Sequence, residues 1–297
     1  MIRYGLCCKF NREPIKFRDT TATRLAKLPR PEQLSILSGI CRDNVKALRR
    51  SIEYCAAHNI GSFRINSRIL PLKTHPQSGY NIADLPDGPS IIGGFRECGA
   101  LATQTVIRLT FHPDQFVLLN SPRPEVVESS LKELAYQNEV ADWVGADVIN
   151  IHGGGMYGNK TTALAQLTEA LCKLPESLKK RLTLENDDRT YTPADLLPVC
   201  LSSGIPLVYD VHHHRCNPDS LSIAEATTAA LATWDREPLF HLSSPRDGWS
   251  CSDPRPHHDY IDPQDFPPEW LPLNITVEIE AKAKEDAIAR LQQDMTP

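Results

Sequence analysis

The sequence has no run of apolar residues approaching the ~18 that a helix needs to cross a bilayer. Its nine cysteines are scattered and form no Cys-x-x-Cys pair, which argues against a secreted disulfide framework. It also lacks a signal-peptide pattern, a low-complexity linker and any block of like charge. We therefore expect a reduced, cytoplasmic protein that is not attached to a membrane.

A strong excess of positive charge is also missing. The formal net charge is −5, which argues against a basic coat protein of nucleic acid but leaves a DNA enzyme open, because bound cations would cancel several carboxylates. The hydrophobic content of 41% is enough to bury a full core. Because α/β barrels of this length form one unit, we expect a single domain over residues 1–297.

Short apolar segments typical of β-strands alternate with helical patterns along the chain. A stripe of apolar residues at intervals of three and four between residues 34 and 55 predicts the first long helix. Alternation of this kind favours a parallel sheet, and eight units favour a single (β/α)8 TIM barrel. Two long connections, at 67–89 and 243–272, are expected at its C-terminal mouth. The predicted strands are 2–7, 62–65, 106–110, 148–151, 182–184, 207–209, 239–240 and 276–279.

From the third strand onward, each strand-like segment runs into a side chain that can bind a metal ion. In a (β/α)8 barrel, the C-terminal ends of the strands converge on one mouth, where active sites lie. Imidazole and carboxylate together suit divalent ions such as manganese, zinc or iron. The sequence therefore predicts a barrel enzyme with more than one metal ion. The strand-end residues are His112, His152, Glu185, Asp210, His241 and Glu280.

Other histidines lie near these positions without a settled role. His212, His213 and His214 follow Asp210, and strand alternation would direct only some of them inward. His257 and His258 lie in the second long connection, so one of them could reach the mouth.

The motifs together resemble the UV damage endonuclease family over residues 2 to about 288. The resemblance implies a barrel similar to endonuclease IV with a cluster of two or three divalent ions, manganese first, with zinc, magnesium or cobalt as alternatives. It also implies an enzyme that nicks double-stranded DNA immediately 5′ to cyclobutane dimers and 6-4 photoproducts, leaving a 3′-hydroxyl and a 5′-phosphate. The motifs are FHPDQFVLLNS, NIHGGG, LENDD, DVHHH, HLSSP and VEIEAKAKE.

The resemblance also implies a set of metal ligands. Among them we expect Glu185, His152, Glu280 and His241 to be essential for catalysis. The choice of His257 over His258 stays open, because either could fill the position in the motif. The implied ligands are His112, His152, Glu185, Asp210, His213, His241, His257 and Glu280.

The same resemblance predicts contacts to the lesion. The family inserts a Gln-Tyr pair into the duplex, and this chain has Gln115 and Phe116, which keep an aromatic face for stacking. Asn11 is also expected among the lesion contacts, after a first strand that lacks the tyrosine of some members. Arg64 is expected to contact a phosphate because of its charge and its place at a strand end, independently of the resemblance. Some members carry a modified lysine where this chain has Leu239, so that modification is not expected.

Two other functions are compatible with these patterns. A metal-dependent sugar isomerase or epimerase would use the same ligand types on the same barrel, and a damage-binding protein would contact DNA without cleaving it. The Gln115-Phe116 pair and the long mouth connections favour a polymer over a small sugar, and the full ligand set favours catalysis. Damaged duplex DNA is the expected partner, with no obligate protein partner.

Overall fold

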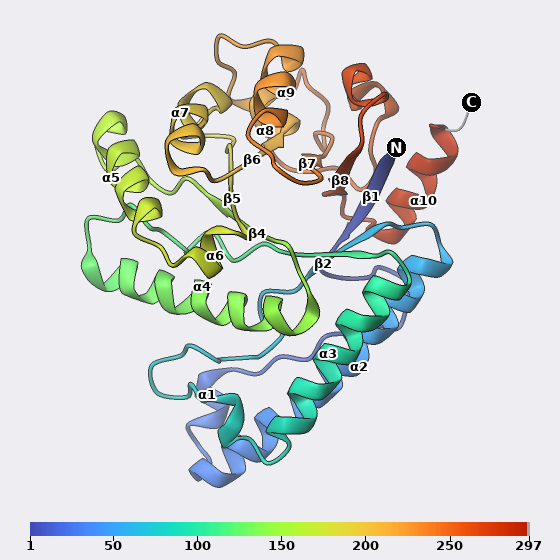
Figure 1. Ribbon diagram of the computed structural model, residues 1–297. Helices are drawn as coiled ribbons and strands as arrows, with labels where there is room; N and C mark the ends of the chain where they lie inside the picture. The colour runs from blue at the N-terminus through green and yellow to red at the C-terminus, as the bar shows by residue number, and fades with distance from the viewer. Residues whose placement is uncertain (296–297) are drawn as a thin grey trace.

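A computed structural model describes residues 1–295 as a closed barrel of eight parallel strands in chain order (Figure 1). The predicted fold is therefore confirmed, while residues 296–297 of the expected domain lie outside the described residues. The strands are β1 (Ile2–Cys7), β2 (Ser62–Ile65), β3 (Arg108–Phe111), β4 (Val148–His152), β5 (Leu182–Glu185), β6 (Leu207–Asp210), β7 (Leu239–Leu242) and β8 (Ile275–Ile279).

Helices surround the barrel on the outside (Figure 1). They are α1 (Ala22–Leu25), α2 (Arg30–Ala57), α3 (Gly88–Gln104), α4 (Pro124–Val144), α5 (Lys160–Cys172), α6 (Glu176–Lys179), α7 (Pro193–Ser203), α8 (Val211–Cys216), α9 (Ile223–Leu231) and α10 (Glu285–Asp294), with the 3-10 turns η1 (Ile82–Asp84), η2 (Pro263–Asp265) and η3 (Pro268–Trp270). Within residues 1–295, no helix is both long and apolar enough to span a membrane.

Local sequence signals account for many of the helix boundaries. Thr192 caps α7 and forms a capping box with Asp195, and the proline after Thr192 occupies the first turn. Gly145 ends α4 in the left-handed conformation, with φ 70°, where a side chain would be strained. The predicted stripe between residues 34 and 55 is the buried face of α2.

The sequence pattern predicts no element for residues 90–105, yet α3 covers most of them. Its glycines lower the helix propensity of the segment. The structure gives one of them a packing role: a Cβ at Gly94 would lie 2.6 Å from Cγ1 of Val45 on α2. The close contact between α2 and α3 at Gly94 therefore outweighs the low helix propensity of glycine. The third strand also begins later than predicted, because Val106 is an exposed turn residue with φ 58°.

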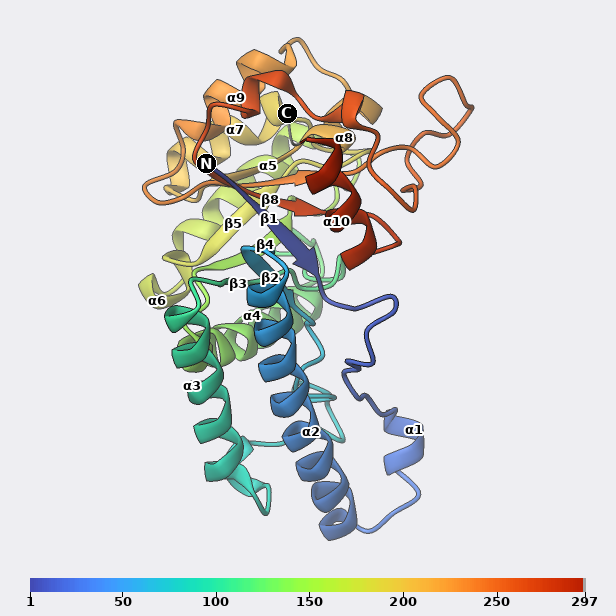
Figure 2. The ribbon, with the colours of Figure 1, turned by 90° about the vertical axis from the view of Figure 1, so that its right-hand side faces the viewer.

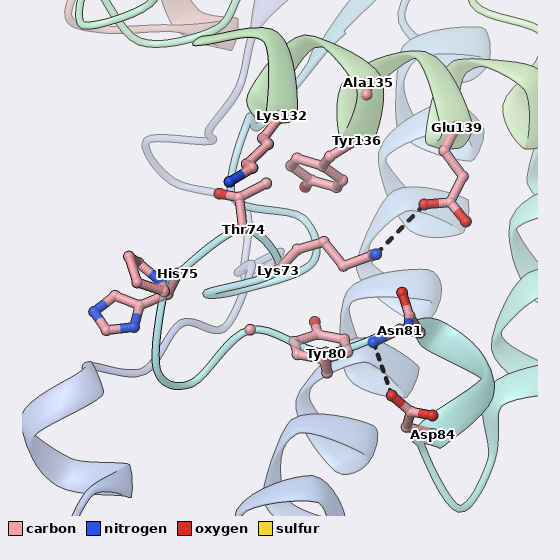
Figure 3. Close-up of a pocket in the computed structure, with 12 residues that line it drawn as sticks. Lys73, Thr74, His75, Tyr80, Asn81, Asp84, Lys132, Ala135, Tyr136 and Glu139 are labelled. Atoms are coloured by element: carbon pink, nitrogen blue, oxygen red, sulfur yellow. Dashed lines mark hydrogen bonds and ion pairs between the residues drawn. The ribbon is translucent and has the colours of Figure 1, made fainter. Parts of the chain in front are cut away.

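The two long connections follow different courses. The segment after β2 packs against α4, where Lys73 pairs with Glu139 at 3.6 Å beside a hollow of about 620 Å³ (Figure 3). No predicted metal ligand lines this hollow. The segment after β7 projects on the side to which the arrowhead of β1 points (Figure 2). Trp270 anchors its return by donating from Nε1 to Thr227 Oγ1 at 2.9 Å.

Candidate metal centre at the barrel mouth

Three groups of potential ligand atoms lie at the C-terminal ends of the strands. Within each group, the atoms lie within 4.8 Å of one another, which is a separation that one ion can bridge. Glu185 and Asp210 each belong to two groups, so the groups are joined. The groups are His112 with His152 and Glu185; Glu185 with Asp210 and His213; and Asp210 with His241 and Glu280.

Glu185 stands at the centre of this cluster at the end of β5. Its side chain is 1% exposed, and Oε2 lies 2.9 Å from His112 Nε2 and 4.0 Å from His152 Nε2. Its other oxygen, Oε1, lies 3.0 Å from His241 Nδ1. The parallel ladder sets this geometry, because β4 pairs His152 directly with Glu185. One carboxylate therefore faces histidines from three other strands.

The histidines after Asp210 lie on a helix rather than on an extended strand, which corrects the expected alternation. Asp210 is the N-cap of α8, and its Oδ1 accepts from the His213 backbone N–H at 2.7 Å. The helical turn directs His213 to Glu185, with Nδ1 3.4 Å from Oε1. His214 instead faces Asp219 at 3.1 Å, and His212 lies 3.2 Å from the Arg255 carbonyl oxygen.

The long connection after β7 brings His257 to the cluster. An antiparallel bridge pairs His257 with Pro245, and its Nδ1 lies 3.7 Å from Glu280 Oε2. His258 points into its own loop, where its Nδ1 accepts from the Tyr260 backbone N–H at 2.9 Å. The structure thus brings the eight implied ligands together and places His257, rather than His258, beside Glu280.

Two buried atoms in the cluster lack hydrogen-bond partners among the described residues: Asp210 Oδ2 and His152 Nδ1. A buried carboxylate oxygen without a donor is costly, because burial removes its hydration. A divalent cation would satisfy that oxygen, and the mixture of imidazole and carboxylate donors suits borderline ions. The residues present therefore fit a bound divalent metal.

The electrostatics of the cluster favour a charged Glu185 beside protonated His213 and His241, whereas burial lowers the pKa of His152. Burial alone would raise the pKa of Glu185, but His241, His152 and His112 outweigh it and hold the pKa well below its usual range. Burial alone would lower the pKa of His241, yet Glu185 outweighs it and raises the pKa to about 10. The pKa of His213 is raised against the same effect of burial, mainly by Asp210 and Glu185. A metal ion must displace these protons to bind.

One buried residue beneath the cluster, Glu278, is absent from the predicted set. It is 1% exposed, lies 3.2 Å from His241 Nε2 and accepts a hydrogen bond from Thr110 Oγ1. This contact orients the ring so that Nδ1 faces Glu185. A signal was present in the sequence, because Glu278 lies two residues before Glu280 and extended backbone directs side chains at that spacing to the same side.

We expect Glu278→Gln to lower the affinity for Mn(II) by about 10- to 100-fold, since outer carboxylates orient metal-bound histidines. Calorimetric titration of the chelator-stripped protein with Mn(II) measures the affinity. Glu237→Gln is the matched control, because Glu237 pairs with Arg3 at 2.9 Å away from the ligand groups. Equal affinities in the wild-type protein and Glu278→Gln would contradict the role.

Arg64 lies in a different environment from the exposed rim that its expected phosphate contact requires. It is 7% exposed, forms a short ion pair with Glu278 and lies 2.6 Å from Glu280 Oε1. Because two carboxylates hold the guanidinium, Arg64 is part of the interior network of the mouth. Asn11 does lie on the surface, where its Nδ2 donates to Asp286 Oδ2 at 3.0 Å.

The expected lesion-contacting pair is exposed in the loop that follows the ligand His112. Gln115 and Phe116 follow β3 and His112, and Phe116 is 73% exposed, unlike a core aromatic. Phe116 rims a groove of about 650 Å³, whose lining also includes Arg68 and Lys132. The same lining includes the carboxylates of Asp19, Asp114 and Glu133, and Arg68 pairs with Asp19 at 3.3 Å. The groove therefore carries charges of both signs beside the exposed ring.

The glycines after His152 serve the protein's own packing. Gly154 has φ 85°, and a Cβ there would lie 2.2 Å from Asn120 Oδ1. Asn120 also donates from Nδ2 to the Gly155 carbonyl oxygen at 2.8 Å. Gly154 therefore allows the backbone to approach the Asn120 side chain closely.

Comparisons with known proteins agree with this geometry. A family model described as UV-endonuclease UvdE matches residues 2–297. A UV DNA damage endonuclease from Bacillus velezensis is 36% identical over 313 aligned residues, covering 100% of this chain and 94% of that protein. The crystal structure of SacUVDE superposes with a TM-score of 0.88 at 26% identity, covering 99% of this chain and 98% of that one. Endonuclease IV from Thermus thermophilus shares the fold, with a TM-score of 0.60 at 16% identity and coverage of 98% and 97%.

Proposed function

The chain belongs to the UV-endonuclease UvdE family, and on that basis we propose that it is a divalent-metal-dependent DNA repair endonuclease. Its substrate is duplex DNA that carries a UV photoproduct, and it hydrolyses the phosphodiester immediately 5′ to the lesion. The products are a 3′-hydroxyl and a 5′-phosphate. The observation that carries the proposal is the convergence of three joined ligand groups on one barrel mouth.

The chain's residues have distinct tasks in this reaction. Divalent ions, when bound, neutralise the phosphodiester, lower the pKa of the attacking water and stabilise the leaving 3′-oxygen. Glu185 and Asp210 hold neighbouring positions of the cluster, because each belongs to two ligand groups. His152 and Glu280 belong to different ligand groups, and Glu278 keeps the His241 ring in place. Manganese is the proposed ion, because mixed imidazole and carboxylate donors suit it.

Lesion choice follows from the cost of deforming DNA. A damaged step is already poorly stacked, so inserting a side chain there costs less than in intact duplex. Phe116 is the candidate wedge, because its ring is exposed four residues after the ligand His112 and Gln115 precedes it. The groove behind the ring supports an extended substrate over a small sugar.

We expect Phe116→Ala to reduce the preference for damaged over intact duplex, because stacking on a base contributes roughly 1–3 kcal/mol, about 5- to 150-fold. Competition binding between dimer-containing and undamaged duplexes measures it. Metal content should stay at the wild-type level, since Phe116 belongs to none of the ligand groups. Unchanged preference would show that Phe116 does not probe the lesion.

The test of the proposed function is a gel assay on a labelled duplex with one defined cyclobutane dimer. With Mn(II), we expect a single nick immediately 5′ to the dimer, and with EDTA no nick. The 3′-hydroxyl is confirmed if a polymerase extends it. Failure of folded, metal-loaded protein to nick with any divalent ion would overturn the proposal, and epimerisation of a sugar by the same protein would replace it.

A further inference from the structure

Lys284, in the turn between β8 and α10, has a backbone conformation that is rare for a side-chain-bearing residue. Its φ is 54° and its ψ is −120°. The left-handed region open to L-residues has ψ near +30° to +60°, so this conformation lies outside it and is normal only for glycine. Such strain persists where the surrounding structure enforces it, and it is concentrated at functional sites.

The neighbouring residue, Glu285, holds this conformation in place through hydrogen bonds. Glu285 is buried, and its carboxylate accepts backbone N–H groups from Asn11 at 2.7 Å, Arg12 at 2.7 Å and Glu13 at 3.1 Å. These bonds tie the loop after β1 to the first turn of α10. On the other side, the Ala283 backbone N–H donates to the Asp259 carbonyl oxygen at 3.0 Å. Lys284 is thus held between two anchored residues.

The charge of Lys284 lacks a partner among residues 1–295, which distinguishes it from comparable lysines. Of the other half-buried lysines in that range, Lys73, Lys160 and Lys179 each pair with a carboxylate, at 3.6, 2.8 and 3.1 Å. Lys284 is also half-buried, yet its Nζ makes no ion pair or hydrogen bond with these described residues. Partial burial of an unpaired cation is costly and favours a role with an anion from outside.

The position of Lys284 is at the barrel mouth. It lies four residues after Glu280, and β8 pairs with β1 so that Ile279 lies opposite Leu6. The charge of Lys284 therefore acts on the end of β1: burial raises the pKa of the Cys7 thiol, and Arg64 and Lys284 oppose that effect. Glu280 is already paired with Arg64, so it does not neutralise Lys284.

We propose that Lys284 binds a phosphate of the DNA backbone on the β1 and β8 side of the mouth. This inference rests on the proposed function, because it takes duplex DNA as the substrate. A lysine suits the task, since its ammonium is a compact charge that can meet a phosphate oxygen from several directions. The strained turn fixes where that charge lies relative to the metal ligands.

The experiment measures binding of metal-loaded protein to undamaged duplex over a range of salt concentrations. Each neutralised phosphate contributes about 0.9 to the slope of log K against log salt, so Lys284→Ala should reduce the slope by about that amount. Lys284→Arg should keep the slope. Lys284→Gly should show the same reduced slope as Lys284→Ala. It should also raise the midpoint of thermal unfolding, because glycine relieves the strain. Lys180→Ala, an exposed lysine just before β5 at the opposite end of the barrel, is the matched control and should leave the slope unchanged.

An unchanged slope in Lys284→Ala, or an equal loss in Lys180→Ala, would overturn the inference. The rate of nicking by the wild-type protein, measured separately on the dimer duplex, tests the proposed function. Because undamaged duplex is the probe for Lys284, a wild-type protein that binds but does not nick would refute the function while the slopes still decide the phosphate contact.

Discussion

Glu185→Gln is expected to abolish nicking, with a loss of about 10³-fold or more in the single-turnover rate. Loss of an outer carboxylate alone costs about 10- to 100-fold, and Glu185 is itself shared by two ligand groups. The amide has lost the charge that lowers the energy of a bound cation, and its NH2 group would face histidine nitrogens. Cleavage of the dimer duplex with excess enzyme, together with metal content, measures both effects.

The matched control for this substitution is Asp188→Asn. Asp188 follows the same strand but belongs to none of the three ligand groups, so nicking should stay within a few-fold of wild type. Thermal unfolding of both variants separates loss of the site from loss of the fold. Near-wild-type turnover in Glu185→Gln would refute its place at the centre of the cluster.

Adding Mn(II) to chelator-stripped protein is expected to restore nicking, to stabilise the fold and to release protons. At a free concentration of about 100 times Kd, binding to the folded state alone adds about 2.7 kcal/mol to the free energy of unfolding. The protons come from His213 and His241, whose raised pKa values mean that they are protonated at neutral pH.

The sign of the pH dependence follows from these pKa values. The stability that protonated His241 gives the stripped protein is fully present below the unfolded pKa of about 6.5 and is lost as the pH rises toward about 10. Protons therefore compete with metal across this window, so the affinity for Mn(II) should rise with pH. Calorimetric titrations at several pH values, in two buffers of different ionisation enthalpy, measure both affinity and proton release. An affinity that is independent of pH, without proton release, would contradict the assigned ligands.

The sequence was most informative where one local signal decides the structure. β1 and β2 occur at the predicted residues, and each strand-end ligand predicted from His112 to Glu280 lies at or near the end of a strand. An apolar segment that ends in a polar residue specifies both the strand and the end that faces the mouth.

Other features depended on contacts that are distant in sequence. The choice between His257 and His258 required the bridge to Pro245. The burial of Arg64 required Glu278 and Glu280 from the end of the chain, which the sequence does not place beside it. The strain at Lys284 likewise arises because Glu285 binds a loop near the other end of the chain.

The distribution of the ligand groups along the barrel also has a mechanical consequence. His112 follows the third strand and Glu280 follows the eighth. Ions bound across the joined groups would therefore cross-link segments that are distant in the sequence. Moving β8 away from β7 and β6 would then require release of the metal, because Glu280 shares its ligand group with His241 and Asp210. Backbone amides of β8 should consequently exchange with solvent more slowly when Mn(II) is bound. The rate of hydrogen exchange in β8 would then report directly on metal loading.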